Sequence, residues 1–148
     1  MERNEKDKLV EQNREIAKVF YERFQKRDWE GMKSLFGLNY KYHLAGNPVS
    51  TSDTQKQRLF ELHEGFPELS VIVHRVIADK DNAAVIFTIE GVHNGSFVGI
   101  KSTGKKIHVA SVGFFRFENG KISEYSEIFH LLRLLEQIGE LQPLVKNW

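Results

Sequence analysis

The sequence predicts an α+β domain in which amphipathic helices come first and an antiparallel sheet follows. Apolar residues recur at helical spacing through roughly the first 65 positions, and beyond Glu68 the pattern changes to the alternation of strands. The Asn119-Gly120 pair separates two of these alternating segments and is typical of a tight hairpin turn. A length of 148 residues fits one domain, which we expect to span residues 1–148.

The helical part divides at residues that commonly cap or end helices. Asp28 is a suitable N-cap, Gly37 marks a helix end, and Gly65 with Pro67 stops the last helical segment. The expected elements are, in order, a helix over residues 4–27, a short helix over 29–36, a short strand over 40–44, a turn over 46–48 and a helix that begins at residue 52 or 53 and stops before 65.

The second part contains four expected strands, at residues 69–78, 83–93, 106–118 and 121–130, and then a helix over 131–138. Both faces of the strand over 106–118 are largely apolar, so both must be covered. Because the helices can cover only one face, we expect the other to meet a second copy of the chain in a homodimer. The outward residues of that interface are His108, Ala110, Val112, Phe114, Ile86 and Ile128.

Composition excludes several classes of function. The 21 Lys and Arg against 20 Asp and Glu give a net charge of +1, which argues against binding to nucleic acid. The absence of cysteine excludes disulfides, thiolate metal sites and a cysteine nucleophile. The first residues lack the apolar stretch of a secretory signal, and no run approaches the roughly 20 apolar residues of a membrane span. We therefore expect a cytoplasmic protein that does not contact membranes.

Motifs for bound metals or cofactors are missing as well. No pair of histidines with a nearby acid forms a convincing metal triad, and no phosphate-binding or dinucleotide-binding glycine motif is present. The expectation is a protein without metal or cofactor.

Five segments carry a resemblance to a known family. They are residues 66–69, 91–100, 103–106, 115–122 and 132–139, and together they extend in order over nearly the whole chain. In these segments the chain resembles the SnoaL-like polyketide cyclases, or predicted ester cyclases, of the nuclear transport factor 2-like and ketosteroid isomerase-like superfamily. The resemblance implies a cone-shaped fold, in which a curved antiparallel or mixed sheet and N-terminal helices close an apolar pocket and the sheet forms a dimer.

The resemblance also implies a chemistry. Characterised cyclases of this family close a ring by an intramolecular aldol reaction without metal or cofactor, using an acid on the last strand as general acid and base. Glu127 aligns with that acid. The chain has Glu124-Tyr125-Ser126-Glu127 where the family usually has Glu-His-Trp-Asp, and Gly113 where a polar residue is usual.

Glu127 is the candidate general base. It shares a strand face with Tyr125 and Phe129, and an aromatic neighbourhood is typical of a tuned carboxylate. The alternative is a solvated strand residue, or one that is paired with Arg116 or Arg75.

Tyr125 and His43 complete the candidate catalytic group. The Tyr125 phenol would donate to a developing enolate oxygen, or it is a core aromatic whose hydroxyl reaches water. His43 matches a histidine common on the family's short strand and would polarise a carbonyl, or it lies on the surface. The other expected pocket residues are Tyr21, Phe66, His93, Gly113 and Phe129, although His93 would equally serve as a structural hydrogen-bonding residue of its loop.

The sequence thus indicates a cofactor-free enzyme that abstracts a proton alpha to a carbonyl, of the aldol cyclase or isomerase type. Its partner would be a small apolar carbonyl-containing ligand or substrate. The alternatives are a non-catalytic small-molecule binding protein with the same cone fold, and a structural dimer whose cavity is filled. Only the enzyme requires a base with an adjusted pKa in the group formed by Glu127, Tyr125 and His43.

Overall fold

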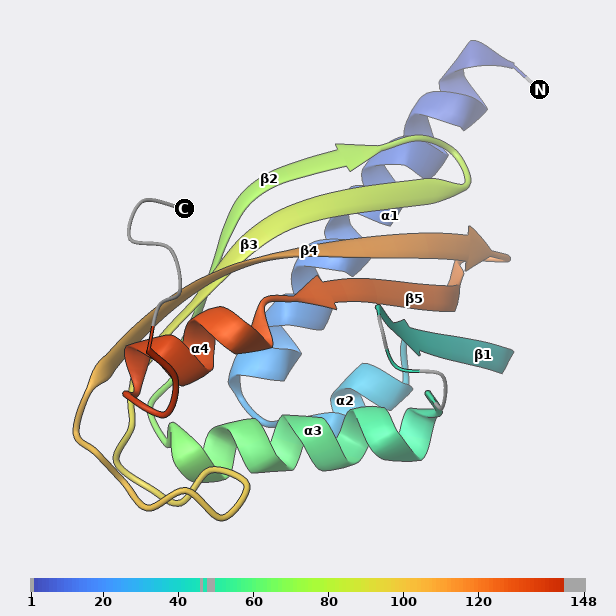
Figure 1. The fold of residues 1–148 in the computed structure, drawn as a ribbon. Helices are drawn as coiled ribbons and strands as arrows, with labels where there is room; N and C mark the ends of the chain where they lie inside the picture. Colours follow the sequence, from blue (N-terminus) through green and yellow to red (C-terminus); the bar gives the residue numbers. More distant parts are fainter. Residues whose placement is uncertain (1, 46, 48–49, 143–148) are drawn as a thin grey trace.

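The computed structural model describes residues 2–45, 47 and 50–142, and it has a mixed α+β architecture as expected. The elements are α1 (Arg3–Gln25), α2 (Trp29–Lys33), β1 (Phe36–Leu44), α3 (Ser52–Gly65), β2 (Ser70–Ala78), β3 (Asn82–Val92), β4 (Lys106–Glu118), β5 (Lys121–Phe129) and α4 (Leu131–Gln137). The sheet is curved and does not close, and α1 and α3 lie inside the curve (Figure 1). This arrangement is the cone shape that the resemblance implies.

The sheet has five strands in the order β1-β5-β4-β3-β2. The four strands from β2 to β5 form the expected antiparallel meander. β1 joins the edge of this meander parallel to β5, which makes the sheet mixed. The parallel register places Tyr42 beside Tyr125 and Leu44 beside Glu127. Residues far apart in the sequence therefore meet on one face of the β1-β5 pair.

The boundary between α2 and β1 differs from the sequence prediction. The helix ends at Lys33, and Phe36 begins a strand instead of ending the helix. Phe36 pairs with Ile122 of β5 and stacks on Tyr40 with the ring centroids 3.7 Å apart. Packing against the sheet outweighs the helical spacing here, so Gly37 lies within a strand. Only Asn47 of the turn expected over residues 46–48 lies among the described residues.

The core lies between the inner face of the sheet and the helices. In β4 every second residue from Ile107 to Phe117 is buried, as the alternating pattern predicts. Phe20 of α1 is fully buried and packs edge-on against Phe115, with the centroids 5.1 Å apart. This aromatic packing joins α1 to the centre of the sheet.

Apolar side chains also cover the outer face of the sheet. Ile86 is 45% exposed, Phe114 is 47% exposed and Ile128 is 55% exposed. They come from β3, β4 and β5, the three central strands of the sheet. The expectation that both faces of the central strands are apolar is therefore met in the folded chain.

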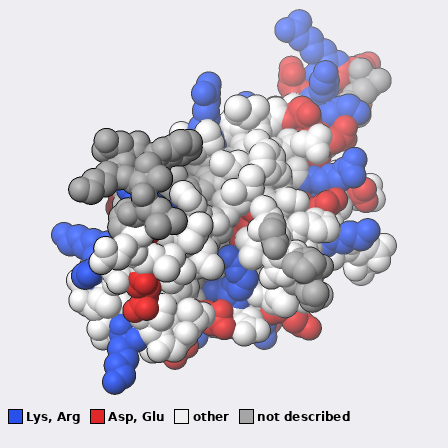
Figure 2. All heavy atoms as spheres, in the orientation of Figure 1, with Lys and Arg blue, Asp and Glu red and all other residues white. Residues whose placement is uncertain are grey.

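Charged side chains of both signs are interspersed over the face drawn in Figure 2, and a group of positively charged atoms lies near its centre. No helix in the described part of the chain is both long and apolar enough to cross a membrane.

Candidate active site

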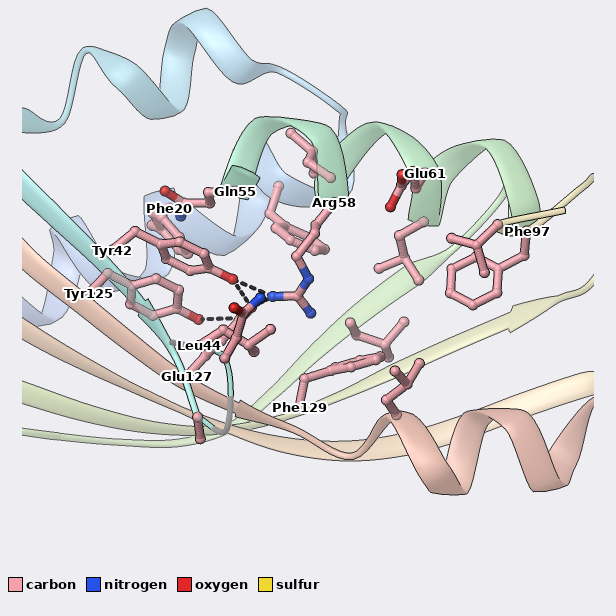
Figure 3. Close-up of a pocket in the computed structure, with 18 residues that line it drawn as sticks. Phe20, Tyr42, Leu44, Gln55, Arg58, Glu61, Phe97, Tyr125, Glu127 and Phe129 are labelled. Carbon is pink, nitrogen blue, oxygen red and sulfur yellow. Dashed lines mark hydrogen bonds and ion pairs between the residues drawn. The ribbon is translucent and has the colours of Figure 1, made fainter. Parts of the chain in front are cut away.

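A cavity of about 450 Å³ opens between α3 and the β1-β5 edge of the sheet. Its wall is mainly apolar, and Glu127, Arg58, Gln55 and Glu61 bring polar groups into it (Figure 3). The apolar part of the lining consists of Phe20, Phe24, Leu44, Ala45, Leu59, Leu62, Ile89, Phe97, Val98, Phe129 and Leu131. A concave apolar site with a few converging polar groups is the usual form of a small-molecule site.

Glu127 is the centre of the polar group. Its Oε1 accepts a hydrogen bond from the Tyr42 hydroxyl at 2.6 Å and from Arg58 Nη1 at 2.8 Å. Its Oε2 accepts from the Tyr125 hydroxyl at 3.2 Å. The Glu127 side chain is 13% exposed. One carboxylate oxygen is therefore held by two short bonds, one of them charge-assisted, and the other by a single long bond.

A second phenol lies behind Tyr125. The hydroxyls of Tyr21 and Tyr125 are 3.0 Å apart, and because Tyr125 donates to Glu127, Tyr21 donates to Tyr125. The chain of donors Tyr21, Tyr125 and Glu127 Oε2 thus runs from α1 to β5. Gly113 makes room for it, since a Cβ at this position would overlap the Tyr21 hydroxyl. The Tyr21 hydroxyl therefore occupies the space that a side chain at position 113 would fill.

These phenols stay protonated well into the alkaline range. Burial raises the pKa of Tyr125 well above its ordinary value, and the nearby Tyr21 and Glu127 act in the same direction. Burial also raises the pKa of Tyr21, and it outweighs the opposing effect of the hydrogen bond to Tyr125. The pKa of Tyr42 is raised first by burial and then by the charge of Glu127. All three phenols therefore remain hydrogen-bond donors at neutral pH.

Helix α3 supplies the cation. It begins with a capping box in which Thr51 and Thr54 satisfy each other's backbone N–H groups, which fixes the start of the helix. Gln55 and Arg58 follow one turn apart on the side that faces the cavity. Gln55 Oε1 accepts a hydrogen bond from Tyr40 at 2.8 Å. Arg58 also donates to the Tyr42 hydroxyl, so one guanidinium nitrogen contacts both Tyr42 and Glu127.

Three of the residues named from the sequence meet at the cavity wall: Glu127, Tyr125 and Phe129. Tyr21 lies one layer deeper and reaches the site through Tyr125. Gly113 also lies in that layer, beside the two hydroxyls.

His43 does not lie at the cavity, contrary to the expectation from the sequence. Its side chain is 52% exposed, and Nε2 lies 3.0 Å from Glu124 Oε1. It is not among the cavity residues, because Tyr42 and Leu44 occupy the inward positions on either side of it. The structure therefore places His43 in a surface contact with Glu124 and outside the cavity lining.

Phe66 and His93 are buried together away from the cavity lining, which corrects their assignment as pocket residues. Phe66 is fully buried and packs on the His93 ring with the centroids 5.3 Å apart. His93 Nδ1 accepts from the Thr103 backbone N–H at 3.2 Å and lies 3.0 Å from the Thr103 hydroxyl. His93 thus holds the connector between β3 and β4, as the structural alternative predicted.

Arg58 and Tyr42 are the site residues that the sequence reasoning missed. Arg58 lies on the helical stripe of Gln55, Leu59 and Leu62, where a charged residue is unusual. Tyr42 lies on the inward parity of β1, and that alternation alone excludes His43 from the same face. The expected cationic partners, Arg75 and Arg116, do not contact Glu127, whose ion pair is with Arg58.

No group of three or more His, Cys, Asp or Glu residues within the described ranges is placed to hold a metal ion. The polar side chains that line the cavity are one arginine, two carboxylates, two amides and two phenols. This set suits hydrogen bonding and proton transfer.

Comparisons with solved structures agree with the cone fold. AclR of Streptomyces galilaeus, assigned as a hydroxylase, shares 23% identity over 93% of this chain and 87% of its own, with a TM-score of 0.82. A protein of Jannaschia sp. CCS1 named as a SnoaL-like polyketide cyclase shares 22% identity over 91% of this chain and 96% of its own, with a TM-score of 0.79. An LEH-like epoxide hydrolase of M. tuberculosis shares 14% identity over 87% of this chain and 90% of its own, with a TM-score of 0.64.

A search among curated proteins gave no match. The sequence itself matches the family model of the SnoaL-like polyketide cyclases over residues 15–138, from the middle of α1 to the residue after α4. That stretch contains every element of the sheet and all the residues that contact Glu127. By this match over most of its length, the chain belongs to the SnoaL-like polyketide cyclase family.

Proposed function

We propose that the protein is a cofactor-free enzyme that removes a proton alpha to a carbonyl group of a small apolar substrate, of the aldol cyclase or isomerase type. The observation that carries this proposal is the carboxylate of Glu127 at the wall of an apolar cavity, with two donors on Oε1 and a single long hydrogen bond on Oε2. Oε2 is the oxygen with the greater capacity to accept a proton. An enclosed carboxylate beside apolar walls is suited to general base catalysis.

The phenols supply hydrogen bonds that can stabilise the negative charge as it moves from the carboxylate to the substrate. When the α-proton passes to Glu127 Oε2, the electron pair of the C–H bond moves into the carbonyl group, and the negative charge passes from the carboxylate to the enolate oxygen. Tyr125 and Tyr42 already donate to the carboxylate, and rotation of their hydroxyl hydrogens, with the rings fixed, would redirect these donors to the enolate as the carboxylate loses its charge. Return of the proton from Glu127 to another carbon completes an isomerisation. In an aldol closure the enolate carbon attacks a second carbonyl, and the alkoxide that forms takes the proton from Glu127.

A non-catalytic binding protein is the second candidate. The observation that favours it is the 2.8 Å ion pair of Glu127 with Arg58, since a carboxylate held by a guanidinium also fits a purely structural or binding role. The two candidates differ in one respect that can be measured: only the enzyme exchanges the α-protons of a bound ketone with solvent.

The test is α-proton exchange of 2-tetralone, a small apolar ketone, in D₂O followed by proton NMR. The Glu127→Gln variant keeps the shape of the side chain but cannot accept a proton. We expect it to lower the exchange rate by about 10²-fold or more, as loss of a general base does. Glu124→Gln is the matched control, because Glu124 lies on the same strand and pairs with His43 outside the cavity. Exchange at the buffer rate with wild-type protein that binds the ketone would favour the binding protein.

We also propose a homodimer formed through the outer face of the sheet, and residence in the cytoplasm. The exposed apolar residues of β3, β4 and β5 support the dimer, because a monomer that leaves them in water exposes an apolar patch across its central strands. The absence of cysteine is compatible with a reducing compartment.

A further inference from the structure

The guanidinium group of Arg58 uses only part of its hydrogen-bonding capacity. Nη1 donates to both the Tyr42 hydroxyl and Glu127 Oε1, which accounts for its two hydrogens. Nε and Nη2 make no hydrogen bond to any residue within 2–45, 47 or 50–142. These two nitrogens form one edge of the planar guanidinium, with three N–H groups.

That edge faces the apolar part of the cavity. The guanidinium carbon lies 5.9 Å from the centre of the Phe129 ring, a cation-π distance. In Figure 3 the group reaches toward Tyr42 and Glu127 on one side, and its other side is directed to the space between Phe97 and Phe129. Arg58 is one of the residues that line the cavity, and its side chain is 29% exposed. Unsatisfied donors of a cation beside an apolar wall favour a ligand that brings acceptors.

We propose that the Nε–Nη2 edge of Arg58 is a carboxylate-binding subsite, and that the ligand of this cavity is an apolar compound bearing a carboxylate. Two parallel N–H groups in one plane match the two oxygens of a carboxylate. This inference rests on the proposed uptake of a small carbonyl substrate by the same cavity, and it adds the chemical class of that substrate. An ester group at the same place would carry no negative charge to pair with the guanidinium.

The charges in the cavity make the subsite relevant to the base. Arg58 is the only cation among the described residues that line it, and Glu127 and Glu61 are the acids. Glu61 accepts a hydrogen bond from the exposed Gln57 at 2.8 Å. A ligand carboxylate on the free edge would compete with Glu127 for one guanidinium. It would weaken the bond from Nη1 to Oε1 when the substrate is bound.

The test compares two probes of the same size, 2-naphthoate and the uncharged 2-naphthamide, by isothermal titration calorimetry at neutral pH. Wild-type protein should bind the carboxylate at least about tenfold more tightly, which is the usual scale of a charged bidentate contact. Arg58→Gln should abolish this preference. Arg75→Gln removes a cation from the exposed part of β2 and should leave the preference unchanged.

Glu127→Gln provides a second measurement that does not depend on an Arg58 variant folding. It removes the competing carboxylate, so it should strengthen binding of 2-naphthoate severalfold and leave 2-naphthamide unchanged. Equal affinities of the two probes for wild-type protein, binding of neither at millimolar concentration, or a preference that survives Arg58→Gln would overturn the subsite. These binding measurements do not require turnover. Their outcome can therefore be distinguished from the outcome of the α-proton exchange test of Glu127.

Discussion

Adding one methyl group at Gly113 tests whether the phenol pair fixes the position of Glu127. A Cβ built at this position overlaps the Tyr21 hydroxyl and lies 2.8 Å from both the ring and the hydroxyl oxygen of Tyr125. Tyr21 and Tyr125 are each 2% exposed, and rigid rings in a filled core cannot swing aside. The alanine must therefore push the two hydroxyls apart and disturb the donor to Glu127 Oε2.

The expected cost follows from the packing. Forcing one extra methyl group into a filled core costs about 1–3 kcal/mol, and the lost hydroxyl contact adds about 1 kcal/mol. We expect Gly113→Ala to lower the free energy of unfolding by about 2–4 kcal/mol in urea titrations followed by circular dichroism. The 2-tetralone exchange rate should fall as well, because the same contact holds the base.

The matched control is Gly37→Ala in β1. A Cβ there meets nothing closer than 3.7 Å, which is ordinary van der Waals contact, so the free energy of unfolding should change by less than about 1 kcal/mol. In the Gly113→Ala, Tyr21→Phe double variant, removal of the overlapping oxygen should recover part of the loss. If Gly113→Ala is no less stable than Gly37→Ala, the phenol pair is not packed as described.

Three further predictions concern other parts of the structure. Tyr42→Phe should lower the exchange rate about tenfold by removing a donor to the enolate oxygen, whereas His43→Ala should leave the rate unchanged and cost less than about 1 kcal/mol in urea titrations. Val112→Lys should yield monomer or insoluble protein in light scattering; a wild type that is monomeric at micromolar concentration would refute the sheet-face dimer. Because burial raises the folded-state pKa of Tyr21 and Tyr125 above the unfolded value near 10, their contribution to stability is complete below about pH 10 and is lost as the pH rises further. Urea titrations from pH 8 to 11 should show this decline, and the Tyr125→Phe variant should show less of it.

Helices and antiparallel strands could be predicted from the sequence because their signals are local. Alternation in β4 gave the buried set correctly, and the Asn119-Gly120 pair marked the β4-β5 hairpin. The end of α2 was misplaced because Phe36 fits the helical spacing, while its contacts with Ile122 and Tyr40 are tertiary. The energy of such tertiary contacts cannot be predicted from a local sequence pattern.

The site was predicted only in part for the same reason. Strand parity placed Glu127, Tyr125 and Phe129 on one face, and the structure has all three at the cavity. The parallel pairing of β1 with β5 is long-range, so the contact of Tyr42 with Glu127 could not be read from spacing. The family alignment pointed to His43, and the alternation of β1 would have pointed to Tyr42 instead. Periodicity was the better guide to which side chain faces inward.

The stereochemistry of exchange tests the account of Glu127 most directly. A single carboxylate at one wall of a cavity reaches a bound ketone from one side, so it should remove one of the two hydrogens at a given α-carbon. In D₂O, the protein should at first incorporate deuterium at one of the two C1 positions of 2-tetralone, read by NMR in a chiral solvating agent, and Glu127→Gln should abolish this selectivity. Equal incorporation at both positions, or selective exchange that persists in Glu127→Gln, would contradict the assignment of Glu127 as the base.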